Sequence, residues 1–271
     1  MRRRTLLFAA AAAAACPAPG RAVEATLAQA VRAPGRSAKF VARDGTRHPL
    51  EELAFFGVGP GSSVVEIWPG GGYWTEILAP LLHDSGTYRL ALAPADGGPV
   101  DAHFAKASGP MREKLAADPA TYGRVTLGEL GAGHDDLAPP GSVDVVLTFR
   151  NLHNWLAQGD APEMLAAIRR VLKPGGVLGI EDHRGNASRP QDPEAASGYV
   201  RQDYAVALIE HAGFELVASS EMGANSRDTA DWPKGVWTLP PALTLGEQDR
   251  AKYVAVGEAD NFVLKFRCPV G

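Results

Sequence analysis

The chain has 271 residues, of which 45% are hydrophobic and 21% charged, as expected for a globular protein with a full core. Its net charge of −4 argues against a nucleic-acid partner. The only cysteines are Cys16 and Cys268, and no spacing of Cys and His is typical of a structural zinc site.

The first 22 residues have the pattern of a secretory signal peptide: a basic start, an apolar run over Leu6–Ala15 and a possible cleavage position at Ala22. The run is too short for a membrane span, which needs roughly 20 apolar residues. A plain Sec signal, a weak twin-arginine signal and a lipid anchor at Cys16 stay open as export routes. We therefore expect an exported, periplasmic protein with one domain over residues 23–271, which begins with a helical extension.

Helices and strands alternate along the mature chain. The apolar spacing predicts helices over residues 23–31, 48–56, 74–82, 101–117, 162–172 and 198–212. It predicts strands over residues 64–67, 86–94, 123–128, 143–149, 177–181, 214–217 and 262–266. This alternation predicts an α/β fold: a Rossmann-like, doubly wound, mostly parallel sheet with helices on both faces. The last strand is expected to add an antiparallel edge near the C-terminus.

A glycine-rich loop follows the first predicted strand. Val64, Val65 and Ile67 are β-branched, and Gly70, Gly71 and Gly72 come directly before the helix over residues 74–82. A strand, a glycine loop and a helix N-terminus together form the nucleotide-cofactor site of doubly wound folds. The spacing is not G-x-G-x-x-G, which disfavours an ordinary NAD site.

Four segments, in their order along the chain, resemble motifs of the class I S-adenosylmethionine-dependent methyltransferases. Within that class the chain is most similar to a poorly characterised exported group with a Trp-Pro-Gly-Gly-Gly loop. The resemblance covers most of residues 47–267 and implies a methyltransferase that uses S-adenosylmethionine as its cofactor. The four segments are residues 65–72, 135–146, 172–178 and 204–214.

The resemblance assigns cofactor contacts to ten residues. These are Glu66, Trp68, Gly70, Gly71, Gly72, Tyr73, Asp96, Asp135, Asp136 and Asn151. Glu66 either steadies the glycine loop or caps nearby backbone N–H groups. Trp68 stands where the first glycine is usual, and two interpretations stay open. The indole either lines the cofactor pocket, where cation–π attraction to the sulfonium is worth roughly 0.5–2 kcal/mol, or fills the core.

Two positions depart from the family pattern. The acid that usually holds the ribose hydroxyls is replaced by Ala93-Pro94, and Asp96 is the nearest carboxylate. Asp135 and Asp136 come slightly late for the adenine side, and they either contact the cofactor or cap the turn that follows. Cofactor binding is therefore the central question that the sequence raises.

Polar residues behind the strand over residues 143–149 form the candidate chemical site. Arg150, His153 and Asn154 lie there, and His183 follows the next strand on the same rim. His153 is the first choice for a general base because imidazole titrates near neutral pH; alternatively, it only orders the loop. Glu181, Asp182 and His183 could also be interpreted as metal ligands. No further partner stands at a fixed spacing from them, so we expect no metal site.

The sequence thus supports two functions. The first is S-adenosylmethionine-dependent methyl transfer to an unidentified small molecule. The second is an exported, non-catalytic binding protein that retains the methyltransferase fold, which the missing ribose acid and the uncertain supply of cofactor outside the cytoplasm favour.

Overall fold

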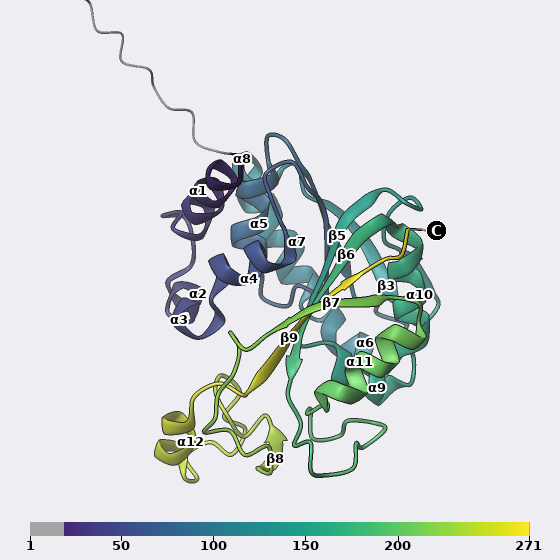
Figure 1. Cartoon of the computed structure of the whole chain (residues 1–271). Coiled ribbons are helices and arrows are strands. Elements are labelled where there is room, and N and C mark those ends of the chain that lie inside the picture. Colours follow the sequence, from purple (N-terminus) through teal and green to yellow (C-terminus); the bar gives the residue numbers. More distant parts are fainter. Residues whose placement is uncertain (1–18, 271) are drawn as a thin grey trace, which may run out of the picture.

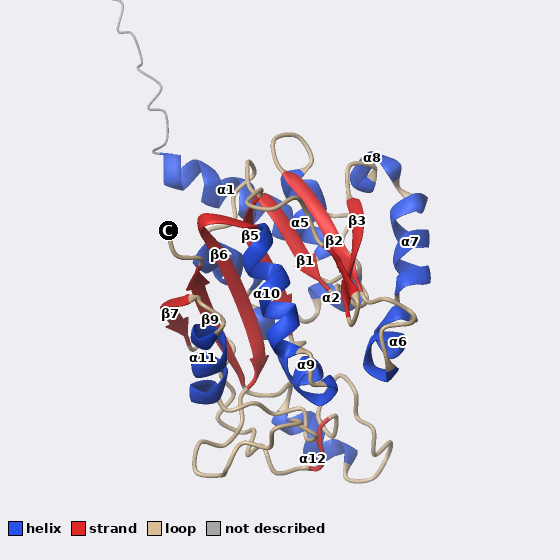
Figure 2. Ribbon diagram, turned by 90° about the vertical axis from the view of Figure 1, so that its right-hand side faces the viewer, coloured by secondary structure: helices blue, strands red, loops and turns tan. Residues whose placement is uncertain are grey.

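An eight-stranded sheet with helices on both faces forms the centre of the molecule (Figures 1 and 2). The computed structural model describes residues 19–270. The strands are β1 (Ser63–Ile67), β2 (Thr87–Leu92), β3 (Thr126–Gly131), β4 (His134–Asp136), β5 (Val143–Phe149), β6 (Leu172–His183), β7 (Glu215–Ser220), β8 (Pro233–Val236) and β9 (Asn261–Arg267). The helices are α1 (Pro19–Val31), α2 (Ala38–Val41), α3 (Asp44–Arg47), α4 (Pro49–Phe56), α5 (Thr75–Leu82), α6 (Pro99–Ala105), α7 (Ser108–Ala117), α8 (Pro119–Tyr122), α9 (Leu152–Gln158), α10 (Ala161–Val171), α11 (Gln202–His211) and α12 (Arg250–Val256).

The sheet has the strand order β4-β3-β2-β1-β5-β6-β9-β7. Strands β3, β2, β1, β5 and β6 run parallel, whereas β9 runs antiparallel to both of its neighbours, β6 and β7. The predicted fold class, with an antiparallel strand near the C-terminus, is confirmed. This strand, β9, lies inside the sheet rather than at its edge. Phe262, Val263 and Leu264 are apolar and fully buried, a pattern that requires cover on both faces.

Alternate side chains of the central strands enter two cores, one on each face of the sheet. In β1, Val65 and Ile67 join the core that includes residues of α9, α10 and α11. Val64 points the other way and joins the core that includes residues of α1, α4 and α5. Each fully buried aliphatic side chain stabilises the fold by about 1.5–3 kcal/mol, so both cores hold the helices firmly on the sheet.

The helix predicted over residues 101–117 is in fact two helices, α6 and α7. Pro110 lies in the first turn of α7 and has no N–H to donate to the carbonyl of Lys106, which a continuous helix would need. The break lets α6 turn toward the carboxyl ends of the strands, where it forms part of the site described below.

The carboxyl ends of β1, β5 and β6 meet at one edge of the sheet because these strands are parallel neighbours. In Figure 1, α12 and β8 lie below this edge, and α2 and α3 lie beside it. Segments from both ends of the chain thus meet at the rim that carries the glycine loop and the predicted chemical site.

Most of the predicted signal peptide, residues 1–18, lies outside the described residues. Helix α1 runs through Ala22, the predicted cleavage position. Among the helices that the structure describes, none is long and apolar enough to cross a membrane. Export therefore stays a prediction.

Candidate active site

A cavity of about 720 Å³ opens at the carboxyl ends of β5 and β6, and we call it the main pocket. This volume is in the range of small-molecule sites. Four residues predicted from sequence to be catalytic line it together: Arg150, His153, Asn154 and His183. The other lining residues come from α6, from α3 and the residue before it, from α9, and from the late part of the chain. They are Arg43, Arg47, Pro99, Val100, His103, Phe104, Ala157, Val236, Trp237, Leu239, Pro240, Pro241, Ala242, Glu258, Ala259 and Asn261.

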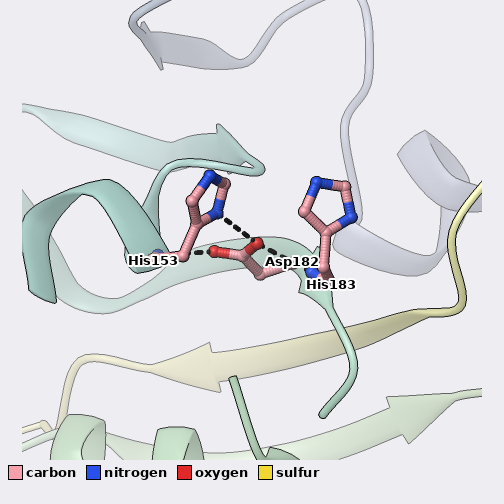
Figure 3. A group of neighbouring side chains, drawn as sticks. All are labelled: His153, Asp182 and His183. Carbon is pink, nitrogen blue, oxygen red and sulfur yellow. Dashed lines mark hydrogen bonds and ion pairs between the residues drawn. The ribbon is translucent and has the colours of Figure 1, made fainter. Parts of the chain in front are cut away.

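A buried imidazole–carboxylate pair lies at the wall of the main pocket (Figure 3). The Nδ1–H of His153 donates to Asp182 Oδ1 over 2.8 Å, and the backbone N–H of His153 donates to Asp182 Oδ2 over 3.0 Å. Because the carboxylate only accepts, Nδ1 donates the proton of this hydrogen bond, and Nε2 keeps a free lone pair in the neutral imidazole. Burial raises the pKa of Asp182, but attraction to His153 in its protonated form and the hydrogen bonds from His153 outweigh burial and lower the pKa overall. Asp182 thus stays ionised and fixes the tautomer of His153.

His183 lies beside this pair, with its ring centre 5.3 Å from that of His153. Its Nδ1–H donates to Asn261 Oδ1 over 2.7 Å, and the Asn261 side chain in turn donates to Glu181 Oε1 over 2.9 Å. Burial lowers the pKa of His183 to about 3. The imidazole is therefore neutral at physiological pH, and its Nε2 is a second acceptor.

The structure supplies the third potential metal ligand that the sequence lacked, because His153 comes close to Asp182 and His183. Their ligand atoms lie within 4.8 Å of one another. The Asp182 oxygens, however, already accept from His153 and from the backbone N–H of His183. The group is therefore built as a hydrogen-bonded base, and the expectation of no metal stays a prediction.

Three arginines on another wall of the main pocket surround one carboxylate. Arg43 forms two hydrogen bonds with Glu258, of 2.5 and 2.6 Å. The Arg47 and Arg150 guanidinium nitrogens lie 3.6 and 3.7 Å from Glu258 Oε2, beyond hydrogen-bond distance. Sequence reasoning missed Arg43, Arg47 and Glu258 because Arg43 and Glu258 are 215 residues apart along the chain and belong to no motif.

The Trp68 side chain fills the space over the glycine loop. Its Nε1–H donates to Leu130 O over 2.8 Å, and its ring stacks on Phe104 of α6 with centres 5.0 Å apart. The backbone of Trp68 adopts φ 47°, which is uncommon for a residue other than glycine. Gly70 and Gly72 also have positive φ, of 56° and 88°, which their lack of Cβ allows.

The cavity left between Trp68, Gly70 and Phe104 has a volume of about 10 Å³. One water molecule needs about that much space, whereas small-molecule sites need roughly 300 Å³ or more. S-adenosylmethionine therefore does not fit over the glycine loop in this arrangement of the side chains. In this arrangement the Trp68 side chain is part of the core, and its role at the cofactor stays a prediction.

Glu66 and Tyr73 connect elements of the fold around the loop. Glu66 is buried and accepts hydrogen bonds from the Tyr88 hydroxyl and from Thr75 Oγ1, and burial raises the pKa of Glu66 to about 7. The Tyr73 hydroxyl donates to Asp44 Oδ1 over 2.7 Å. Asn151 donates to Ile67 O over 3.1 Å, so it joins β5 to β1. Gly71 lies in the same loop, against the Phe40 ring.

The three predicted acidic cofactor ligands lie at the surface, each beside a basic side chain. Asp96 pairs with His134 at 2.9 Å, Asp136 with Arg89 at 2.8 Å, and Asp135 with Arg170. Asp101 of α6 is a buried carboxylate at the end of β3. It accepts a hydrogen bond from the Ala132 N–H over 3.0 Å. The cofactor roles of all ten predicted residues stay predictions.

The comparisons with known proteins agree with this architecture. Residues 113–180 match the family described as "Methyltransferase domain". The uncharacterized methyltransferase sll0829 of Synechocystis sp. is 33% identical over 137 residues, which is 50% of this chain and 53% of that protein. The chain thus spans about half the length of the curated relative that it matches.

Solved structures are similar in fold over most of the chain. A SAM-dependent methyltransferase from Aquifex aeolicus superposes with a TM-score of 0.52 at 16% identity, and the match covers 90% of this chain and 98% of that one. The [4+2]-cyclase SpnF gives a TM-score of 0.54 at 18% identity over 93% and 95%. At such identities the likeness shows the fold and not the reaction. The chain is therefore similar in fold to a solved SAM-dependent methyltransferase and, over residues 113–180, similar in sequence to the methyltransferase-domain family.

Proposed function

We propose that the chain catalyses S-adenosylmethionine-dependent methyl transfer to a small molecule that binds in the main pocket. The observation that carries this proposal is the buried His153–Asp182 pair, which lines a pocket at the carboxyl ends of the strands. When bound, S-adenosylmethionine would supply the methyl group. The match of residues 113–180 to the methyltransferase-domain family and the likeness to methyltransferase sll0829 support the class of reaction and leave the acceptor open.

The His153 imidazole has the tautomer that a general base needs. With Nδ1–H donating to Asp182, Nε2 can take the proton of an acceptor hydroxyl or amine, and the ionised carboxylate stabilises the imidazolium that forms. The neutral His183 ring next to it offers a second acceptor that can orient the same group. Phe104, Trp237 and Leu239 give the pocket apolar walls beside these two histidines.

Cofactor binding has to displace the Trp68 ring or separate it from Phe104, because the space between them is about 10 Å³. The apparent affinity for S-adenosylmethionine is then reduced by the fraction of molecules in which this space is open. We therefore expect weak cofactor binding by the wild-type chain.

The test uses the purified chain with S-adenosylmethionine and a panel of small hydroxylated and aminated acceptors. Mass spectrometry measures the S-adenosylhomocysteine that forms. We expect turnover that His153→Gln abolishes, whereas His211→Ala on the exposed side of α11 retains it as the matched histidine control. Methyl transfer is refuted if no S-adenosylhomocysteine forms and calorimetry detects no binding of S-adenosylmethionine or S-adenosylhomocysteine at millimolar concentration.

The filled space at Trp68 favours a second candidate function, a binding protein that keeps the fold without catalysis. Such a protein would bind its ligand in the main pocket and form no S-adenosylhomocysteine with any acceptor. Turnover that depends on His153 would exclude it.

We also propose that the protein is exported, on the pattern of its first 22 residues. Cell fractionation followed by mass spectrometry of the mature N-terminus tests this. A chain found in the cytoplasm with residues 1–22 intact would contradict it.

A further inference from the structure

We propose that the main pocket binds a small organic anion, whose carboxylate or phosphate group is held by Arg43, Arg47 and Arg150. The identification of this anion as the methyl acceptor rests on the proposed function. The anion site itself rests on the charges, hydrogen bonds and walls of the pocket.

Two of the three guanidinium groups lack the partner that a buried arginine usually has. Arg47 is 6% exposed, and its Nε, although buried, has no hydrogen-bond partner among the described residues. Its closest carboxylate is Glu258, at 3.6 Å. Arg150 lies 3.7 Å from the same carboxylate, which Arg43 already engages with two hydrogen bonds. Unused guanidinium N–H groups at a pocket wall are suited to binding an oxyanion.

The charge balance of this wall favours an anion. Burial lowers the pKa of Arg47 to about 9, and repulsion from Arg150 contributes. Glu52 and Glu181 lie nearby outside the lining, and burial together with the Glu181 charge raises the pKa of Glu52 well above its usual range. Among the charged side chains that line this wall, three guanidinium groups, those of Arg43, Arg47 and Arg150, face one carboxylate, that of Glu258.

Two features hold the arginines at the pocket. Arg47 stacks on the Tyr73 ring, with its guanidinium carbon 4.5 Å from the ring centre, and this contact leaves its N–H edge available. Arg150 has φ 60°, a left-handed conformation that residues other than glycine seldom adopt. Its backbone N–H donates to Glu181 O over 2.7 Å, which holds that conformation. A purely structural ion pair with Glu258 would require neither feature.

The remaining walls describe the rest of the ligand. Phe104, Trp237, Leu239 and neighbouring prolines give an apolar surface, which fits an aromatic or aliphatic body. The Nε2 atoms of His153 and His183 are acceptors, so the ligand should carry a hydroxyl or amine. His103 also lines the pocket and is the remaining titratable group on the α6 side of the lining. A phenolic carboxylate or a phenolic phosphate has all the required features.

Calorimetry without S-adenosylmethionine tests the proposal on the full chain, with 4-hydroxybenzoate, 4-hydroxyphenyl phosphate and the uncharged 4-hydroxybenzamide as probes. We expect at least one anionic probe to bind at least 10-fold tighter than the amide. Which of the two binds tighter identifies the oxyanion. Arg47→Gln and Arg150→Gln should each weaken anion binding about 10-fold or more, while Arg250→Gln on the exposed side of α12 should leave it unchanged.

Glu258→Gln is the decisive variant because it should bind the anion several-fold tighter, a gain that a misfolded protein cannot produce. It removes the carboxylate that competes for the three arginines. Equal binding of the amide and both anions, or unchanged affinity in Arg47→Gln and Arg150→Gln, would overturn the proposal. Anion binding without turnover would instead leave this site standing and count against methyl transfer.

Discussion

Replacing Trp68 by glycine should open the space over the glycine loop at a calculable cost in stability. Truncating a buried tryptophan to alanine costs about 3–5 kcal/mol, and the lost hydrogen bond leaves the Leu130 carbonyl without its partner at a further cost of about 1 kcal/mol. Glycine removes the left-handed strain at φ 47°, which is worth about 1–2 kcal/mol. We therefore expect Trp68→Gly to lose about 2–5 kcal/mol and to be about 1–2 kcal/mol more stable than Trp68→Ala.

The same variant should bind cofactor better than the wild-type chain. Removal of the indole leaves room beside Gly70 and Phe104, so the cofactor no longer has to displace a packed side chain. We expect the affinity for S-adenosylhomocysteine to rise at least 10-fold in calorimetry. Urea unfolding of the same samples measures the stability change.

Trp232→Ala is the control for this experiment. Trp232 packs in a separate cluster with Tyr253, away from the glycine loop, so its truncation should destabilise the chain without improving cofactor binding. If the wild-type chain binds S-adenosylhomocysteine as tightly as Trp68→Gly does, the indole does not obstruct the cofactor and the steric argument is refuted.

Three further predictions concern the pocket and its support. Asp182→Asn should lower turnover at least 100-fold because it removes the charge that stabilises protonated His153; unchanged kinetics would show that His153 is not the base. Burial raises the pKa of Glu66 from 4.5 to about 7, so the folded state holds the proton more tightly and stability falls as pH rises from about 4.5 to 7. Urea unfolding should show that loss, about 3 kcal/mol, in the wild-type chain and not in Glu66→Gln; parallel pH curves would contradict it. Gly235→Ala should disrupt the pocket wall, since its Cβ would lie 2.1 Å from Ser197 O, and normal anion affinity with normal stability would show that the wall adapts.

The strands of the central sheet could be predicted because their apolar pattern is local. Val143–Phe149 is apolar at five of its seven positions, on both faces of the strand, and the predicted strand and β5 have the same bounds. The helices α2 and α3 have only four residues each, too few for a helical period to show, and the sequence predicts neither. These short helices nevertheless determine the site, because Arg43 and Arg47 lie directly before and at the end of α3.

The parallel topology accounts for the part of the site that the sequence predicted. Arg150, His153 and His183 follow the carboxyl ends of neighbouring parallel strands, and such ends lie side by side. No local pattern indicates that Asp182 is the partner of His153, since 29 residues separate them. Likewise, whether Trp68 fills the core or lines a pocket depends on Phe104 and Leu130, which approach it only in the folded chain.

The glycine loop and the arginine wall are parts of one packed unit, although they look unrelated in the sequence. The Tyr73 hydroxyl donates to Asp44, which also accepts two hydrogen bonds from Arg36, at 2.7 and 2.8 Å. That network fixes α3, and Arg47 at the end of α3 then stacks on the Tyr73 ring. Tyr73, predicted as a cofactor contact, therefore connects the N-terminal extension to the loop. The loop that carries Trp68 is therefore joined through Tyr73 to the helix that carries Arg47.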